Sequence, residues 1–386
     1  MNTRITFDKD HFRIADNCGG FSKDVARRYA FCFGKPDSPE ELSQIDIDGS
    51  VGVFGIGMKR ALFKIGKRFV VESRTTSESW RVEVDVDAWR KTKEWTFPFT
   101  ETSKSSPKQE PGTSIRVTEL YPNVARDFVD GTFESKLNAE IRRKHSDALH
   151  RGFTITLREI PVKPEIGQLL RSNTIRPAFK KFKVIPQTGE HVVVRLIAGL
   201  GDSYPRDAGW YIYCNGRMVV GADRTSTTGW GEPGMLPLPH PQYARFRGYA
   251  FLDSRHASDL PWNTSKTGVD ETSPVWRKVK QQMASMAQPI FSFMNRVKEM
   301  TEEGSDAQKE LDKVAQVTIY NVSHANKFSA KIVGSAPKTH PGNEWIRYQK
   351  PGSEVAVVSK ALGIVNDPSR VGKKTFEYYL EHVAED

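Results

Sequence analysis

Two glycine-rich segments near the start of the chain constrain its fold more than any other feature. The first segment, 16–21, reads Asp-Asn-Cys-Gly-Gly-Phe and places a carboxylate at the end of an apolar strand. The second segment, 52–59, reads Gly-Val-Phe-Gly-Ile-Gly-Met-Lys and leads into a helix. Successive backbone N–H groups of a glycine loop before a helix form an anion-binding nest. The pair therefore predicts a ligand site with a hydrogen-bonding carboxylate at one end and a nest for phosphates at the other.

Read with their flanks, these segments resemble the GHKL (Bergerat-fold) ATPase superfamily, and within it the MORC and MutL types. The superfamily also includes DNA gyrase, the ninety-kilodalton heat-shock chaperones and histidine kinases. Its pattern D-x-G-x-G is matched by Asp16 and Gly20, but Cys18 stands where the first glycine usually lies. A glycine at that position lets the backbone approach the nucleotide closely. The second pattern, G-x-x-G-x-G, is met in full by Gly52, Gly55 and Gly57.

The resemblance implies an ATP site and assigns roles to residues of this chain. Asp16 is expected to accept a hydrogen bond from the adenine amino group, and Thr113, just before the strand 114–118, to hold that aspartate. Lys266, in the loop 260–268, is expected to reach the terminal phosphate, where its charge stabilises phosphoryl transfer. Lys266 is the predicted catalytic residue, and the predicted ATP-binding residues are Asp16, Gly20, Gly52, Phe54, Gly55, Ile56, Gly57, Lys59 and Thr113.

Each of these features has a simpler interpretation when it is taken alone. A single glycine-rich loop is usually a turn, and Asp16 alone would be a solvated turn residue. Most lysines lie in solvent, although Pro261 and Trp262 give Lys266 a rigid setting that favours a functional role. The order and spacing of the three motifs, each at a strand or helix boundary, favour the nucleotide site over the simpler interpretations.

One part of the family's catalytic apparatus is not found in the sequence. GHKL ATPases carry, before the aspartate strand, a helix with a water-activating glutamate and a magnesium-binding asparagine. Only a few residues precede the strands predicted at 4–7 and 12–15, which leaves no room for that helix. Glu40 and Glu41 lie between the glycine motifs, and no geometric argument makes them substitutes. The implied ligands are ATP and Mg²⁺, without the usual asparagine and with no other metal site predicted.

Several hypotheses therefore stay open. In the first hypothesis the chain is part of a longer or split protein whose helix is encoded upstream. In the second a partner subunit supplies the helix, and in the third the chain is a nucleotide-sensing pseudoenzyme. Because phosphoryl transfer relies on a positioned metal and water, we expect weak or no ATP hydrolysis by this polypeptide alone. The leading function is an ATP-operated conformational switch acting on DNA or RNA, with nucleotide-dependent dimerisation as an option. The alternative is a chaperone-like or scaffolding module that clamps another protein.

The predicted fold class is α+β. Residues 1–160 are expected to form a truncated Bergerat-type α/β sandwich with helices on one face of a mixed sheet, ending in a helix at 133–151 and a strand at 153–157. Residues 161–300 are expected to form a β-rich transducer domain. Its predicted strands include 191–198 and a hairpin over 209–220 that turns at Asn215-Gly216. A long helix is expected to start near Pro274 and to kink at Pro289.

Residues 301–386 resemble no family and are expected to be a linker with a small interaction module. The polar stretch 301–316 predicts a linker or an exposed helix, and the segments 317–322 and 330–333 are expected to pair as strands. Two helices are predicted at 355–362 and 375–383, separated by a loop over 363–374.

Composition bears mainly on partners and location. The 386 residues carry a formal net charge of +10, which favours an anionic partner such as DNA or RNA. Among the basic clusters are Lys180-Lys181 with Lys183. The three cysteines lack C-x-x-C spacing and cannot form a disulfide framework. No apolar run is long enough to cross a bilayer, so we expect a cytoplasmic protein, or a nuclear one in a eukaryote, without a membrane partner.

Overall fold

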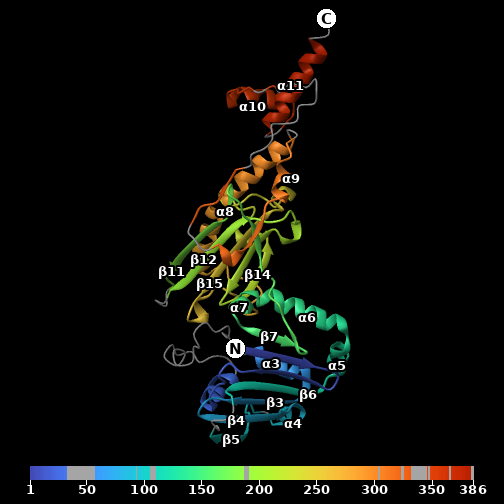
Figure 1. Ribbon diagram of the computed structural model, residues 1–386, viewed down its shortest axis with the longest axis vertical. Coiled ribbons are helices and arrows are strands. Elements are labelled where there is room, and N and C mark those ends of the chain that lie inside the picture. The colour runs from blue at the N-terminus through green and yellow to red at the C-terminus, as the bar shows by residue number, and fades with distance from the viewer. Residues whose placement is uncertain are drawn as a thin grey trace. The chain divides into compact units, whose positions relative to one another are not determined.

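The computed structural model describes residues 1–32, 57–92, 94–104, 110–186, 191–302, 305–322, 326–331, 346, 348–364 and 367–383. The chain divides into two compact units, Met1–Ser335 and Ala336–Asp386, each of which is described by itself. It is an α+β protein. The first unit holds a mixed sheet with helices followed by a second mixed sheet, and helices make up the second unit (Figure 1).

The first sheet has eight strands in the order β5-β4-β3-β6-β2-β1-β7-β8. Neighbouring strands are antiparallel except β1 and β7, which pair in parallel. The strands predicted at 4–7, 12–15, 114–118 and 153–157 are confirmed. The strand bounds are β1 (Asn2–Phe7), β2 (His11–Asp16), β3 (Gly66–Arg74), β4 (Glu78–Asp85), β5 (Phe99–Lys104), β6 (Gly112–Leu120), β7 (Thr154–Leu157) and β8 (Ile160–Pro161).

The buried face of this sheet follows from alternating apolar residues in register. Phe7, Phe12, Val117, Phe69 and Val84 lie opposite one another in turn and form one row across five strands. Because alternate side chains of a strand share a face, residues two positions away continue this apolar surface. Helices pack against it in two groups, as expected. The first group is α1 (Lys23–Val25), η1 (Ala26–Ala30), α3 (Gly57–Ile65) and α4 (Val86–Lys91), and the second is α5 (Pro122–Val129), α6 (Gly131–Lys144) and α7 (Ser146–His150).

The predicted helix 133–151 is two helices instead of one. The chain leaves helical geometry at His145, where φ is −112° and ψ is 16°, between α6 and α7. The break lets α7 pack against β14. Ser146 and Asp147 are buried there, and Ser146 Oγ lies 3.3 Å from the hydroxyl oxygen of Tyr213. A tertiary contact therefore decides the break.

The second sheet has five strands in the order β11-β12-β15-β13-β14, with β13 and β15 parallel. The predicted hairpin turn is confirmed, because Asn215 and Gly216 have φ values of 45° and 74°. The helix α8 (Pro274–Glu302) covers one face of the sheet and continues through Pro289. The strand bounds are β11 (Ala178–Val184), β12 (Val192–Leu200), β13 (Gly209–Cys214), β14 (Arg217–Asp223) and β15 (Phe246–Asp253). Short helices between them are η2 (Pro205–Asp207), η3 (Ser226–Thr228), η4 (Pro241–Tyr243) and η5 (Ala257–Asp259).

Of the two structures predicted for 301–316, a linker or an exposed helix, the helix is present, but it is not exposed on every side. The helix α9 (Ala307–Asp312) buries Ala307 and Leu311 in the core shared with α8. The guanidinium of Arg245 donates from Nε to Oε1 of Gln308 at 3.1 Å, which ties α9 to β15's N-terminal side. Two apolar side chains four residues apart are enough to dock one short helix.

The expected pairing of 317–322 with 330–333 was wrong. The strand β16 (Gln316–Thr318), followed by η6 (Ile319–Asn321), pairs with β9 (Gln168–Leu170). The strand β17 (Ser329–Ala330) pairs with β10 (Ile175–Arg176), and residues 332 and 333 lie outside the described residues. Both partners lie far back in the sequence, where very short strands give no periodic signal.

The second unit contains the two predicted helices. The helix α10 (Gly352–Ala361) matches its prediction closely, whereas α11 (Pro368–His382) begins seven residues before the predicted start at Thr375. The second half of the predicted loop 363–374 was therefore wrong. The Asp367 side chain accepts a hydrogen bond from the Arg370 backbone N–H, and proline follows as the first helical residue. Among the described residues, no helix combines the length and apolar character that crossing a bilayer requires.

Candidate functional site

A row of polar side chains crosses the buried face of the first sheet at the ends of its strands. Thr3, Asp16, Thr113 and Ser73 lie opposite one another in turn on β1, β2, β6 and β3, and Trp80 on β4 completes the row. We call these five residues the polar row. It shares the face on which the apolar rows and helices pack, so its groups are sheltered by the core on one side. The sheet thus brings together Asp16 and Thr113, as the sequence predicted.

The backbone after β2 passes so close to the sheet that only glycine fits. Gly20 has φ of +65°, and a Cβ there would lie 2.0 Å from the carbonyl oxygen of Arg74. A Cβ at Gly112 would likewise lie 2.0 Å from the carbonyl oxygen of Asp16. Real Cβ atoms do not approach oxygen so closely, and positive φ is strained for other residues. Both glycines are therefore required by the fold itself.

Hydrogen bonds hold this turn against the polar row. The Phe21 backbone N–H donates to Ser73 Oγ at 2.9 Å, and the Trp80 indole N–H donates to the Phe21 carbonyl at 2.8 Å. The Phe21 and Trp80 rings meet edge to face, with centroids 4.9 Å apart. Ser73 Oγ also lies 3.0 Å from Thr113 Oγ1. Hydrogen bonds and one aromatic contact therefore fix the turn after β2 against β3 and β4.

Asp16 keeps acceptor capacity for a ligand. Its Oδ1 accepts a hydrogen bond from the Cys18 backbone N–H at 2.8 Å, and the Cys18 thiol is the other group that interacts with this carboxylate. An ionised carboxylate offers about four lone-pair positions, so acceptor sites remain. Cys18 is largely exposed, and the partial burial of its thiol together with the Asp16 carboxylate raises the pKa of that thiol. A half-buried carboxylate with vacant acceptor positions suits the amino group of a base such as adenine.

The phosphate end is only partly described. Gly57 begins α3, and a Cβ there would meet no described atom within 4 Å, so the fold itself does not demand a glycine. Lys59 is buried, and its ammonium group donates to the carbonyls of Ala30, at 3.1 Å, and of Cys32. Burial lowers the Lys59 pKa. In this conformation Lys59 therefore links α3 to the end of η1, and its role toward phosphate stays a prediction. The other predicted phosphate-loop residues lie outside the described residues, namely Gly52, Phe54, Gly55 and Ile56.

Lys266 lies on a structured loop between β15 and α8. Trp262 is buried in the hydrophobic core between α8 and the second sheet, which we call the second core, as the expected rigid setting requires. The Asn263 side chain accepts a hydrogen bond from the Thr267 backbone N–H at 3.0 Å. Lys266 itself has φ of 56°, and its ammonium nitrogen lies 5.4 Å from the centre of the Trp262 ring. This loop follows the second sheet whereas the polar row lies on the first, so their meeting stays a prediction.

Sequence reasoning missed Ser73 and Trp80. Both lie on strands that carry no motif, and only the register of β3 with β6 and β4 places them beside Thr113. Across the described part of the chain, no cluster of three or more His, Cys, Asp or Glu side chains could hold a metal ion. The Asp16 carboxylate, with acceptor positions beyond its contacts to Cys18, lies beside two close backbone approaches that only glycine permits, which is the arrangement that a bound base requires.

The comparison with known families agrees with this geometry. Residues 2–114 match the family described as histidine kinase-, DNA gyrase B-, and HSP90-like ATPase. The matched range runs from β1 to the start of β6 and contains the whole polar row, both glycine segments and Lys59. No curated protein matches the chain. Residues 2–114 are therefore similar to a GHKL-type ATPase domain, and ATP binding and hydrolysis are what this similarity implies.

Proposed function

We propose that the chain is an ATP-operated conformational switch of the MORC/MutL type that acts on nucleic acid. The observation that carries this proposal is the polar row, which sets Asp16 beside Thr113 and Ser73 on the sheltered face of the first sheet. In the proposal, the Asp16 carboxylate accepts a hydrogen bond from the adenine amino group. Thr113 and Ser73 position that carboxylate, and Gly20 lets the chain lie against the base.

The phosphates of the nucleotide are proposed to lie at the second glycine segment. Backbone N–H groups of Gly52, Gly55 and Gly57 form the nest for them. This assignment is supported by the space around Gly57. A Cβ at Gly57 would meet no described atom within 4 Å, so the packing does not require glycine there and the space is open to a ligand. Magnesium, which enters such sites with the phosphates and neutralises their charge, would be held mainly by the phosphate oxygens. Lys59 would join them only after leaving the carbonyls that it now contacts.

The switch is proposed to work through Lys266. A lysine that reaches the terminal phosphate favours the closed arrangement of the two sheets only when ATP is bound, because ADP lacks that phosphate. The setting of Lys266 supports this role. Its φ of 56° is unusual for a residue with a side chain, and such strain gathers at functional positions. The Trp262 anchor would transmit the movement of the loop to the second core.

The ratio of ATP to ADP affinity tests the switch. Lys266→Ala should lower ATP affinity while leaving ADP affinity near its wild-type value, measured by calorimetry. Lys278→Ala is a matched control, since Lys278 is an exposed lysine on α8. If Lys266→Ala and Lys278→Ala both leave the ratio unchanged, Lys266 has no part in sensing the terminal phosphate.

Nucleic acid is the proposed client because of charge. Lys180, Lys181 and Lys183 are exposed on β11, at the edge of the second sheet, in a chain with net charge +10. Neutralising phosphates releases counterions and makes binding strongly dependent on salt. The rival function, in which the chain clamps another protein, predicts a complex whose stability depends less on salt.

A further inference from the structure

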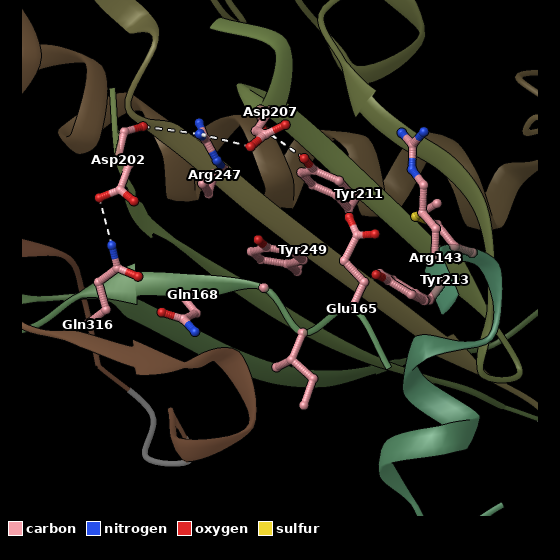
Figure 2. Close-up of a pocket in the computed structure, with 13 residues that line it drawn as sticks. Arg143, Glu165, Gln168, Asp202, Asp207, Tyr211, Tyr213, Arg247, Tyr249 and Gln316 are labelled. Carbon is pink, nitrogen blue, oxygen red and sulfur yellow. Dashed lines mark hydrogen bonds and ion pairs between the residues drawn. The ribbon is translucent and has the colours of Figure 1, made fainter. Parts of the chain in front are cut away.

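A cavity lies on the face of the second sheet that α8 does not cover, and its volume is about 250 Å³ (Figure 2). Tyr211 on β13 lies opposite Tyr249 on β15, and their stacked rings have centroids 5.0 Å apart. These phenols and Arg247 form one wall. The facing wall comes from the segment 165–168 and Gln316, and Arg143 of α6 reaches the cavity from the first sheet's helices. None of these residues belongs to the polar row.

Most polar groups around the cavity are already held in place. The buried Arg247 guanidinium donates to the carbonyls of Ala244 at 2.8 Å and Asp202 at 3.1 Å. The Asp202 carboxylate accepts from the Gln316 amide at 2.6 Å, and the Tyr211 hydroxyl donates to the Asp207 carbonyl at 2.9 Å. These contacts make the walls rigid before any ligand arrives, which lowers the entropy cost of binding.

Four polar side chains at the cavity make no hydrogen bond or ion pair with a described residue, namely Tyr249, Glu165, Arg143 and Gln168. Tyr249 is only 4% exposed, yet its hydroxyl makes no hydrogen bond with any described residue. The ring is buried but the hydroxyl oxygen keeps some exposure to the cavity, where water or a ligand can hydrogen-bond to it. The Glu165 carboxylate and the Arg143 guanidinium belong to exposed residues at the rim of the cavity, and neither makes an ion pair or hydrogen bond within the described ranges. The cavity thus presents a carboxylate, a guanidinium, a phenol and the Gln168 amide to a ligand.

The charges around the cavity indicate what kind of ligand it would take. Three carboxylates, Glu165, Asp202 and Asp207, face two guanidinium groups, Arg143 and Arg247, so the lining carries a small excess of negative charge. A simple anion would leave Glu165 unpaired and meet that excess. A simple cation would leave Arg143 unpaired. Burial raises the Tyr211 pKa to about 12, against the opposing effect of Arg247, so this phenol stays neutral and can only hydrogen-bond.

We propose that this cavity binds a small zwitterion of the amino-acid type. Its ammonium group pairs with Glu165, its carboxylate pairs with Arg143, and the Tyr249 hydroxyl hydrogen-bonds to its polar atoms. The size of the cavity suits a molecule of about a dozen non-hydrogen atoms, smaller than the usual ligand of a drug-sized pocket. The ligand would contact α6 and the second sheet at once.

Calorimetry with the full chain and each common L-amino acid in turn tests this proposal. We expect saturable binding of at least one amino acid. Its decarboxylated amine and its N-acetyl derivative should each bind about tenfold more weakly, the effect of one lost charged contact. Arg143→Gln should abolish the preference for the amino acid over its decarboxylated amine. Glu165→Gln should abolish the preference for the amino acid over its N-acetyl derivative. Lys136→Gln, on the same helix, and Glu110→Gln are matched controls that should change neither preference.

Tyr249→Phe separates a binding role from a structural one. Removing an unpartnered hydroxyl should leave the melting temperature unchanged or raise it, while amino-acid affinity falls about tenfold. The proposal is overturned if no amino acid binds saturably, which would mark the cavity as filled by water alone. It is equally overturned if Arg143→Gln and Glu165→Gln bind with unaltered preferences.

Discussion

Thr113 on β6 lies directly opposite Asp16 on β2, and its hydroxyl oxygen is 3.0 Å from Oγ of Ser73 on β3. Ser73 Oγ in turn accepts the Phe21 backbone N–H, so the turn after Asp16 is held by the strand two positions away in the sheet. The conformation of the turn after Asp16 therefore depends on Ser73, a serine that belongs to no sequence motif.

Ser73→Ala should weaken both folding and nucleotide binding. The change leaves the Phe21 N–H without its acceptor, a loss of about 1–3 kcal/mol in the free energy of unfolding. Ser114→Ala is the control, because Ser114 lies on the opposite face of β6 and only accepts from Arg13 Nε at 3.3 Å. Urea unfolding and ATP titration measure the two effects. Equal losses in both variants would show that Ser73 has no special part in the site.

Gly20→Ala and Gly57→Ala should behave in opposite ways. A Cβ at Gly20 collides with the Arg74 carbonyl, so this variant should unfold at a markedly lower temperature or fail to fold. A Cβ at Gly57 meets no described atom, and alanine favours a helix over glycine by up to about 1 kcal/mol. Gly57→Ala should therefore keep its melting temperature and lose ATP affinity. Unimpaired ATP binding by a stable Gly57→Ala protein would remove Gly57 from the phosphate site.

Cys18 reports on Asp16 through its ionisation. Burial and the neighbouring carboxylate raise the thiol pKa, so less thiolate is present at neutral pH and alkylation is slow. Asp16→Asn removes the negative charge, so the midpoint of the pH–rate profile for alkylation by iodoacetamide should move to lower pH. Peptide mass spectrometry separates Cys18 from the half-buried Cys32 in the same sample, whose profile should not move. An unchanged Cys18 profile would contradict the close contact of the two side chains.

Binding to double-stranded DNA should depend on salt through β11. Lys181→Gln and Lys183→Gln should each reduce the slope of log affinity against log salt by about 1, because each lysine neutralises one phosphate. Lys136→Gln on α6 carries the same charge change on a different element. Identical slopes for all these proteins would place the nucleic-acid surface elsewhere or favour a protein client.

Local pattern was sufficient to predict the strands that carry Asp16 and Thr113. These strands are indicated by the alternating apolar residues of β1 and β2 and by the glycines after β2. Such signals lie within short stretches of chain, so they can be recognised in the sequence without knowledge of the fold. Ser73 could not be predicted, because its place depends on which strand lies beside β6. The same reason explains β16 and β17, whose partners β9 and β10 lie about 150 residues earlier. The start of α11 has a local signal in Asp367-Pro368, a capping residue followed by a proline at the first helical position.

The identity of the base bound beside Asp16 tests the central claim most directly. Adenine presents an amino donor to that carboxylate, whereas guanine presents a carbonyl at the same position. Calorimetry should therefore show that the wild-type chain binds ATP far more tightly than GTP. Asp16→Asn should lose about 1.5–3 kcal/mol of ATP binding and most of the discrimination, while Asp10→Asn, in the exposed turn between β1 and β2, should match wild type. Equal ATP affinity in the wild-type and Asp16→Asn proteins would contradict the account.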